Sequence, residues 1–369
     1  MLGLAAAAVF VAGASAQSPG VPPSEKNHFI GTPKGWVHPM TPWGEPSLEG
    51  TWPIPAGINL ERCAGGGGRG RGNAPPCDPS KAWLTEEEFQ ARVRQLSQPD
   101  RATQALAAGD LGGALQSGVT DPLTPVRQTS LIVDPPNGRL PALTAEGKRR
   151  SALMKSSWAL YPGEPQVWDH WTDFDSWDRC ITRGMPTSMM AYRYNNGLKI
   201  FQAPGMVVIS HEMIHEDRVI YTDGRPPLPP VHKHYLGVPR GRWEGNTLVV
   251  TTTNYKEGPS GTNIGVYGSP PGNRWPVSDQ MKTVERFTRL NDDYILYEMT
   301  IEDPVVMERP YTIQYPLKRD DSYQWWEYNC HEGNRTIVDY ISASRAERAA
   351  KAAGAGSDPG GSQRQPEGR

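Results

Sequence analysis

Hydrophobic and polar residues alternate with a period of two through the second half of the chain, from about residue 198. The alternating stretches are rich in β-branched and aromatic residues and are separated by turn-forming residues. This pattern is typical of strands, because successive side chains point to opposite faces of a sheet. We therefore expect strands over 198–201, 206–215, 218–222, 241–253, 282–291, 294–303, 311–318 and 324–330.

Short turns predict that neighbouring strands pair as hairpins. Residues 290–294 form one such turn, and residues 243–248 form another with Gly245-Asn246 at its corner. Sequential antiparallel strands with short connections favour a mainly β fold. We expect an antiparallel, lipocalin-like up-and-down barrel or a strongly bent sheet, with a loop-rich N-terminal half and a short C-terminal helix.

The N-terminal half is expected to add loops and short helices to this sheet. A first strand is predicted over 48–52, after an extended lead-in over 17–46. A helix is predicted over 84–93, where Thr85 and Glu88 match a capping box, and another begins near residue 143. The chain holds 39 glycines and 36 prolines in 369 residues, which favours short strands and turns over a helical architecture.

These elements predict one β-rich domain over 47–345, with a loop and short-helix insertion over about 60–180. A terminal helix is expected over 344–353. The tail over 354–369 is rich in glycine, serine, proline and glutamine, and we expect it to be disordered.

The N-terminus has the features of a signal peptide over residues 1–16. Residues 2–13 are apolar, and Ala14-Ser15-Ala16 matches a cleavage site, although no lysine or arginine precedes the apolar stretch. A buried N-terminal helix is the alternative, but the following residues are polar and rich in proline. We expect a periplasmic or secreted protein without a transmembrane segment in its mature chain.

Four cysteines agree with an oxidising compartment. None belongs to a C-x-x-C motif, so three disulfide connectivities are possible. Cys63 and Cys77 flank the same glycine-rich loop, and their pairing would leave Cys180 with Cys330. We predict these two disulfides.

Residues His211 to His215 spell H-E-x-x-H, a motif that binds zinc in proteases when it lies on a helix. The flanking residues here predict strands, and the longer form of the motif fails at Arg218 and Tyr221, where it needs glycine and histidine. On a strand, residues 211, 213 and 215 would point to one face. The motif therefore predicts two histidines side by side on a sheet.

An ordered series of motifs resembles a family of exported, uncharacterised bacterial proteins from acidobacteria and proteobacteria. The series covers residues 211–216, 223–226, 241–250, 284–287 and 330–334. The resemblance implies export and a shared β-rich fold, and it implies no reaction. Gly50-Thr51-Trp52 also resembles the first-strand motif of lipocalins, which are shorter proteins without the 60–180 segment.

Polar residues in three blocks are the candidates for a functional site. The catalytic candidates are His211, His215, Arg218, His331 and Glu332. The ligand-binding candidates are His234, Tyr235, Arg242 and Asn334. If the sheet curls, the three histidines converge as bases or as ligands of a divalent transition metal, with Glu332 as an acid–base partner and Arg218 as an anion clamp. The alternative is that the histidines are core polar groups with structural partners. Glu285 is expected on the surface, paired with Arg286 or Arg289.

Two functions remain open at this point. One is an exported enzyme that acts on a small organic substrate in a β-barrel pocket, by hydrolysis, elimination or isomerisation. The other is a non-catalytic, lipocalin-like carrier or envelope protein for an apolar or aromatic ligand. The net charge of −2 gives no electrostatic case for nucleic acid as a partner.

Overall fold

The computed structural model describes residues 30–63, 77–96, 104, 107–109, 125–154, 167–190, 192, 194–257 and 275–354. The signal peptide predicted over 1–16 lies outside the described residues, and so does the predicted tail beyond residue 354.

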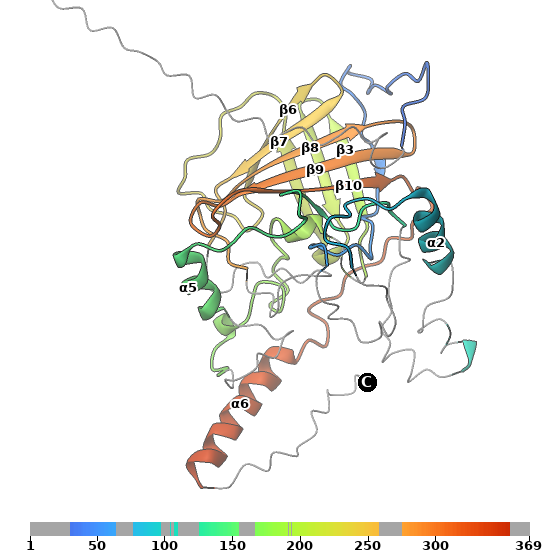
Figure 1. Cartoon of the computed structure of the whole chain (residues 1–369). Helices are drawn as coiled ribbons and strands as arrows, with labels where there is room; N and C mark the ends of the chain where they lie inside the picture. The colour runs from blue at the N-terminus through green and yellow to red at the C-terminus, as the bar shows by residue number, and fades with distance from the viewer. Residues whose placement is uncertain are drawn as a thin grey trace, which may run out of the picture.

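A single ten-stranded sheet forms the body of the protein and curls into a half-barrel (Figure 1). The order of its strands is β1-β3-β4-β5-β6-β7-β8-β9-β10-β2. The strands are β1 (Gly50–Thr51), β2 (Ile132–Asp134), β3 (Leu198–Ala203), β4 (Met206–His211), β5 (Glu216–Tyr221), β6 (Val238–Glu244), β7 (Thr247–Thr253), β8 (Lys282–Arg289), β9 (Tyr294–Glu302) and β10 (Tyr311–Lys318). All neighbouring strands are antiparallel except β5 and β6, which meet in parallel where Tyr221 faces Arg240.

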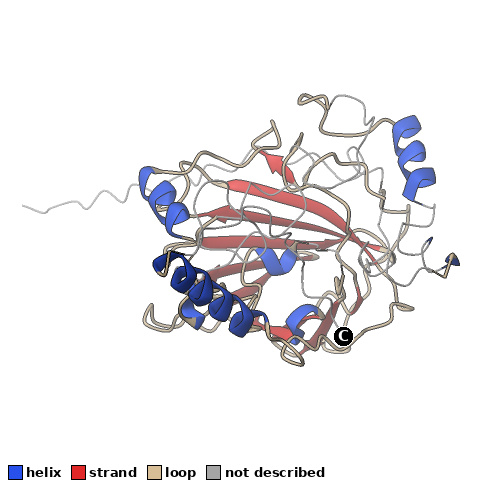
Figure 2. Cartoon of the chain, turned by 90° about the horizontal axis from the view of Figure 1, so that it is seen from below, coloured by secondary structure: helices blue, strands red, loops and turns tan. Residues whose placement is uncertain are grey.

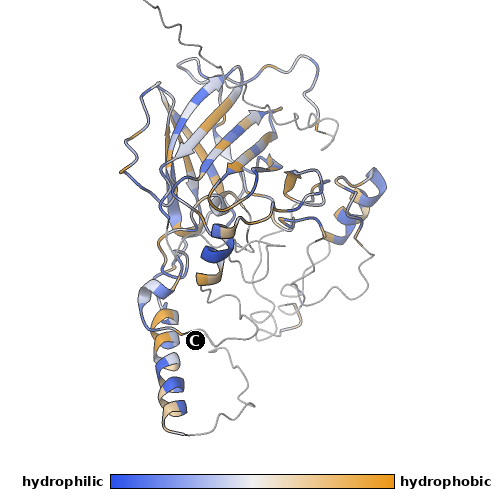
Figure 3. Ribbon diagram, turned by 60° about the vertical axis from the view of Figure 1, so that its left-hand side comes forward, coloured by the Kyte–Doolittle hydropathy of each residue, from blue (hydrophilic) through white to orange (hydrophobic). Residues whose placement is uncertain are grey.

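The period-two pattern correctly predicted the mainly β class and most of the strands. Burial alternates along β8 and β9, so that one face of each strand packs into the core. Hydrophilic and hydrophobic residues alternate along strands of the sheet (Figure 3). Both predicted hairpins are present: β6 and β7 turn at Gly245, and the amide of Leu290 donates to the carbonyl of Tyr294 between β8 and β9.

The strand predicted over 324–330 is wrong. Those residues form no strand, and the chain runs from β10 towards the C-terminal helix as a loop. The physical reason is that the far edge of β10 already has a partner: Thr312 and Ile313 pair with β2, a strand that the sequence had assigned to the loop insertion. A short segment from the N-terminal half thus occupies the place predicted for the C-terminal one.

The prediction of one strand over 206–215 is also wrong beyond His211. Strand β4 ends there, a 3₁₀ turn covers Met213–His215, and the chain returns at Glu216, the residue that faces His211 in β5. Ile214 and His215 have φ angles of 61° and 44°, which reverse the chain direction. His211 is therefore buried and His215 is exposed, so the two histidines do not share a face.

The segment after β1 runs across the half-barrel from one sheet edge to the other. At its start, the amide of Trp52 donates to the carbonyl of Leu198 in β3 over 2.7 Å. At its end, the amide of Leu131 donates to the carbonyl of Asn59 over 2.8 Å, beside β2. Trp52 is completely buried between these points. The helices lie outside the sheet (Figure 2).

An ion pair is buried in the concave side of the sheet. Arg218 in β5 and Glu285 in β8 are 2% and 0% exposed, and Arg218 Nη1 donates to Glu285 Oε1 over 2.9 Å. Arg218 Nη2 donates to the other carboxylate oxygen, and the Tyr297 hydroxyl donates to Oε1 over 2.9 Å. The expectation that Glu285 pairs on the surface with Arg286 or Arg289 is wrong, because its strand parity points it inward.

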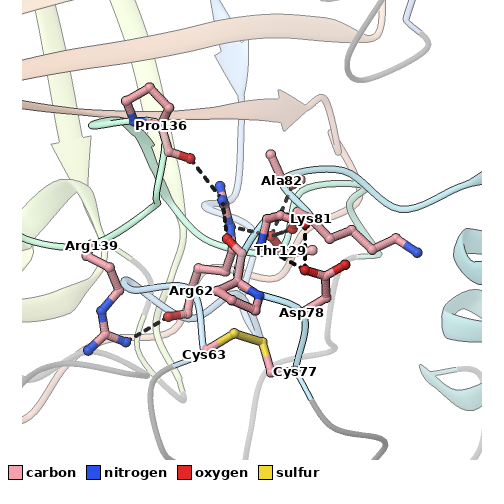
Figure 4. The surroundings of a disulfide bond; sticks show 11 residues. Arg62, Cys63, Cys77, Asp78, Lys81, Ala82, Thr129, Pro136 and Arg139 are labelled. Atoms are coloured by element: carbon pink, nitrogen blue, oxygen red, sulfur yellow. Dashed lines mark hydrogen bonds between the residues drawn. A yellow bond between two sulfur atoms is a disulfide. The ribbon is translucent and has the colours of Figure 1, made fainter.

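Both predicted disulfides are confirmed: Cys63 with Cys77, and Cys180 with Cys330. Figure 4 shows the first, which lies beside Arg62, whose guanidinium donates to the carbonyls of Pro79 and Pro136. Two disulfides indicate an oxidising environment.

The described part of the chain has three bounded α-helices outside the sheet: α2 (Glu86–Leu96), α5 (Ala145–Leu153) and α6 (Thr336–Ala352). The capping box of α2 is confirmed, since Thr85 and Glu88 exchange hydrogen bonds between backbone and side chain. Helix α6 begins eight residues earlier than predicted and projects from the body (Figure 1). Among the described residues, no helix is long and apolar enough to cross a membrane.

The buried ion pair yields a stability prediction. The substitution Glu285→Gln leaves the Arg218 charge buried without its carboxylate, and we expect it to lower the free energy of unfolding by about 3–5 kcal/mol. Urea unfolding followed by tryptophan fluorescence measures the change. Glu244→Gln is the matched control, because Glu244 is exposed and pairs with Arg242 and Arg286 on the surface, where the cost is under about 1 kcal/mol. Equal losses in the two variants would contradict the prediction.

Candidate functional site

Glu212, the glutamate of the H-E-x-x-H motif, is a structural group at the end of the β4–β5 hairpin. It is 1% exposed, and its carboxylate accepts four hydrogen bonds. Oε1 accepts from Asn195 Nδ2 and from the Trp326 amide, and Oε2 accepts from the Gly197 amide and from the Tyr323 hydroxyl, over 2.6–3.0 Å. With its oxygens occupied in this way, Glu212 is not placed to act as the general base of a zinc protease.

A small pocket lies beside this hairpin. It is lined by Ile54, Arg183, Ser188, Met190, Asn195, Asn196, Gly197, His211 and Met213. The space between these residues holds about one water molecule. Gly197 is required here, because a Cβ atom on it would lie 2.7 Å from Glu212 Oε2. The pocket therefore depends on the same carboxylate that holds the hairpin.

His211 presents a neutral imidazole to this pocket. It is 4% exposed, and its Nε2 has no hydrogen-bond partner among the described residues. Burial lowers the pKa of His211 to about 3, and the nearby charges of Arg218 and Arg183 lower it further in the same direction. His211 is therefore uncharged at neutral pH, with one ring nitrogen available to a ligand.

Arg183 brings a buried cation to the same pocket. It is 4% exposed, and its Nη1 donates to the carbonyl of Met190 over 2.9 Å. Its Nε and Nη2 have no partner within the described part of the chain. The guanidinium lies 4.8 Å from the ring of Trp177 and 5.7 Å from that of Tyr192. Burial lowers the pKa of Arg183 to about 10, so it remains charged at neutral pH.

Glu216 lies behind the pocket, opposite His211 in the hairpin. The hydroxyl of Ser188, which lines the pocket, donates to Glu216 Oε2 over 3.3 Å. Burial raises the pKa of Glu216 to about 7, although hydrogen bonds from Thr182, the Arg183 amide and Ser188 oppose this. Burial thus brings the pKa of Glu216 close to neutral pH, and Ser188 connects its carboxyl group to the pocket.

The structure separates most of the catalytic candidates from one another. Arg218 lies on the same inward side as His211, but Glu285 occupies both of its terminal nitrogens. His215 is exposed on the turn, and His331 and Glu332 are exposed after the last strand. Among the described residues, no three His, Cys, Asp or Glu side chains gather in a way that could hold a metal ion.

The predicted ligand-binding residues are not among those that line the pocket. His234 is exposed in the β5–β6 connection, and Tyr235 lies 4.7 Å from the Lys256 ammonium. Arg242 pairs with Glu244 on the surface. Asn334 donates to the carbonyl of Asp178 and to Cys180 Sγ, both over 3.3 Å, which places it beside the disulfide.

Three residues of the pocket region were missed by sequence reasoning: Arg183, Ser188 and Glu216. One signal for Arg183 was present, because it is the only charged residue between Arg179 and residue 193, in a methionine-rich stretch. A charge in such a stretch is expected to be buried and to need a partner. No feature of the neighbouring sequence distinguishes Ser188. The raised pKa of Glu216 results from its burial, which the sequence does not show.

No family model, no curated protein and no solved structure matches this chain.

The low pKa of His211 predicts how stability depends on pH. The unfolded chain binds a proton near the usual histidine pKa of 6.5, whereas the folded protein binds it only near pH 3. The stability that this group contributes is present above about pH 6.5 and is lost as the pH falls towards 3. We expect the substitution His211→Gln to reduce the slope of unfolding free energy against pH in this window, by up to about 1.4 kcal/mol per pH unit.

Urea titrations of both proteins at several values between pH 3.5 and 7 measure these slopes. Glu216 acts in the opposite direction, because its raised pKa gives stability that is lost as the pH rises through about 7. Glu216 is present in both the wild type and His211→Gln, so the difference between their two slopes reports the contribution of His211. Parallel pH profiles would show that His211 is not held neutral by the fold.

Proposed function

We propose that the protein is an exported enzyme that performs acid–base chemistry on a small organic substrate at the His211 pocket. The observation that carries the proposal is that two proton-handling groups line one pocket, the unpartnered Nε2 of His211 and the hydroxyl of Ser188, and that this hydroxyl donates to the carboxyl group of Glu216 behind the pocket. Perturbed pKa values at a pocket are a common feature of catalytic sites.

Glu216 is the general base of the proposed mechanism. A group with a pKa of about 7 is present in both protonation states at neutral pH, which suits it to accept a proton and return it. Ser188 lies between Glu216 and the pocket, so its hydroxyl passes a proton from the substrate or from a bound water to the carboxylate. The neutral imidazole of His211, which lines the same pocket, holds the substrate by a hydrogen bond.

These roles fit hydrolysis, elimination or isomerisation, which all need a proton to be removed and delivered. The residues that perform them come from the loop before β3 and from the β4–β5 hairpin. His215, His331 and Glu332 have no part in this mechanism, because they are exposed and do not line the pocket.

Export is supported by two independent features. The first is the predicted signal peptide over residues 1–16. The second is the pair of disulfides, which form in oxidising compartments. Both features support a periplasmic or secreted location.

The alternative, a lipocalin-like carrier of an apolar ligand, has less support. Such a carrier needs an open apolar cavity inside the sheet. The concave side of the described sheet is instead packed with large side chains, including Trp52, Tyr255, Phe287, Tyr297 and Tyr315, which are all fully buried.

The enzyme proposal is tested by the substitution Glu216→Gln. Purified protein is assayed against a panel of carboxylic esters, lactones and hydroxy acids, including neutral members and members that carry a second carboxylate. We expect turnover that rises with pH through about 7, since Glu216 must be ionised to accept a proton. Glu216→Gln should lower kcat by roughly 10²–10⁴-fold.

Glu298→Gln is the matched control. Glu298 is another largely buried glutamate whose pKa burial raises, but it accepts a hydrogen bond from Gln314 in β10 and does not line the pocket. Its variant should keep the activity. Turnover that is equal in the wild type and in Glu216→Gln would refute the proposed mechanism, and so would the absence of turnover across the panel.

A further inference from the structure

We propose that Arg183 is the anchor of a carboxylate-binding site, and that the ligand of the His211 pocket is a small organic carboxylate. The identity of this ligand as a substrate rests on the proposed function, whereas the binding site itself stands on the geometry of Arg183.

Arg183 differs from every other buried arginine that the structure describes. The others each have a carboxylate partner or three hydrogen bonds to oxygen atoms: Arg62, Arg127, Arg218 and Arg289. Arg183 has one hydrogen bond, to the carbonyl of Met190, and no carboxylate of the described residues lies within ion-pair distance of it. Glu216 acts on Arg183 only from beyond ion-pair distance. A buried charge without a directly paired counter-ion is unfavourable, so this site is suited to receive an anion.

The two unpartnered nitrogens identify the shape of that anion. Nε and Nη2 lie on the same edge of the planar guanidinium, and their N–H bonds run parallel to each other. A carboxylate matches this edge with its two oxygens, which gives a bidentate pair. Nη1, the nitrogen outside this edge, is the one that already has a partner. The free edge thus has the geometry that carboxylates recognise.

The surroundings hold the guanidinium in place and favour a small ligand. Trp177 and Tyr192 contact Arg183 through their rings, so its orientation does not depend on the ligand. Ile54, Met190 and Met213 supply apolar walls to the pocket, and His211 adds a ring nitrogen. The free space between these residues holds about one water molecule, which is less than a carboxylate group occupies, so the ligand enters by displacing that water and moving the lining side chains apart.

The loop that carries Arg183 is fixed from two sides. The disulfide from Cys180 to Cys330 holds its beginning, and the hydroxyl of Tyr315 in β10 donates to the carbonyl of Met189 near its end. A rigid loop keeps the unpartnered edge of Arg183 in position before the ligand arrives, which is what a preformed site requires.

The test uses acetate and acetamide, which have the same shape and differ in charge. Binding is measured by isothermal titration and by the shift in melting temperature, at constant ionic strength set with sodium chloride. We expect saturable binding of acetate and at least tenfold weaker binding of acetamide to the full wild-type chain. Arg183→Lys keeps the charge but loses the parallel N–H pair, and should weaken acetate binding at least tenfold.

Arg242→Lys serves as the control, because Arg242 is an exposed arginine that pairs with Glu244. It should bind acetate as the wild type does. If Arg183→Lys does not fold, the comparison of acetate with acetamide on the wild type decides alone. Equal binding of the two probes would overturn the proposal, and so would undiminished acetate binding by a folded Arg183→Lys. Binding of inorganic phosphate in place of acetate would overturn the carboxylate assignment.

Failure of this inference can be separated from failure of the proposed function by Glu216→Gln. That variant removes a negative charge near Arg183, so it should bind acetate at least as tightly as the wild type while it loses turnover. Turnover that depends on Glu216 without any acetate binding would refute the inference and leave the enzyme proposal standing. Acetate binding that depends on Arg183 without turnover would support the inference and refute the enzyme proposal.

Discussion

The buried ion pair of Arg218 and Glu285 is the interaction on which the curled sheet depends. Their strands, β5 and β8, are separated by two other strands, and in a flat sheet they would lie three spacings, or about 14 Å, apart. The two side chains nevertheless meet in a bidentate contact on the concave side. Neither charge is stable in the core without the other, so the sheet must remain curled for both to stay buried.

This constraint extends to the site. Strand β3 begins opposite His211, so the loop that precedes β3 lies beside the end of the β4–β5 hairpin. The charge of Arg218 helps to keep His211 neutral. Glu212 then joins the hairpin to residues 195–197 and to the segment around Trp326 through its four hydrogen bonds. The pocket is formed where these segments meet, so its shape is a consequence of two saturated carboxylates.

The contrast between saturated and unsaturated polar groups separates framework from site. Glu212 and Glu285 are fully engaged and hold the fold together. Arg183 and His211 are equally buried but keep nitrogen atoms without partners among the described residues. Buried polar atoms in native proteins usually have partners, and these two unsatisfied side chains line the same pocket, which is why a ligand is expected there. The H-E-x-x-H motif contributes one residue to the framework and one to the site. Glu212 is fully hydrogen-bonded, whereas His211 keeps a nitrogen atom without a partner in the described part of the chain.

The sequence by itself determined what depends on neighbours along the chain. The period-two alternation, the turn at Gly245 and the capping box of Thr85 are local patterns, and the structure contains all three. The two disulfides followed from the position of Cys63 and Cys77 around one loop. Only the tertiary structure decided the features that depend on distant residues. The partner of Arg218 is 67 residues away, β2 reaches β10 from the N-terminal half, and the turn at Ile214 ends the alternation that would have placed His215 beside His211. The anion site was missed for the same reason: burial and the absence of a partner are properties of the packed chain, and no spacing of residue types records them.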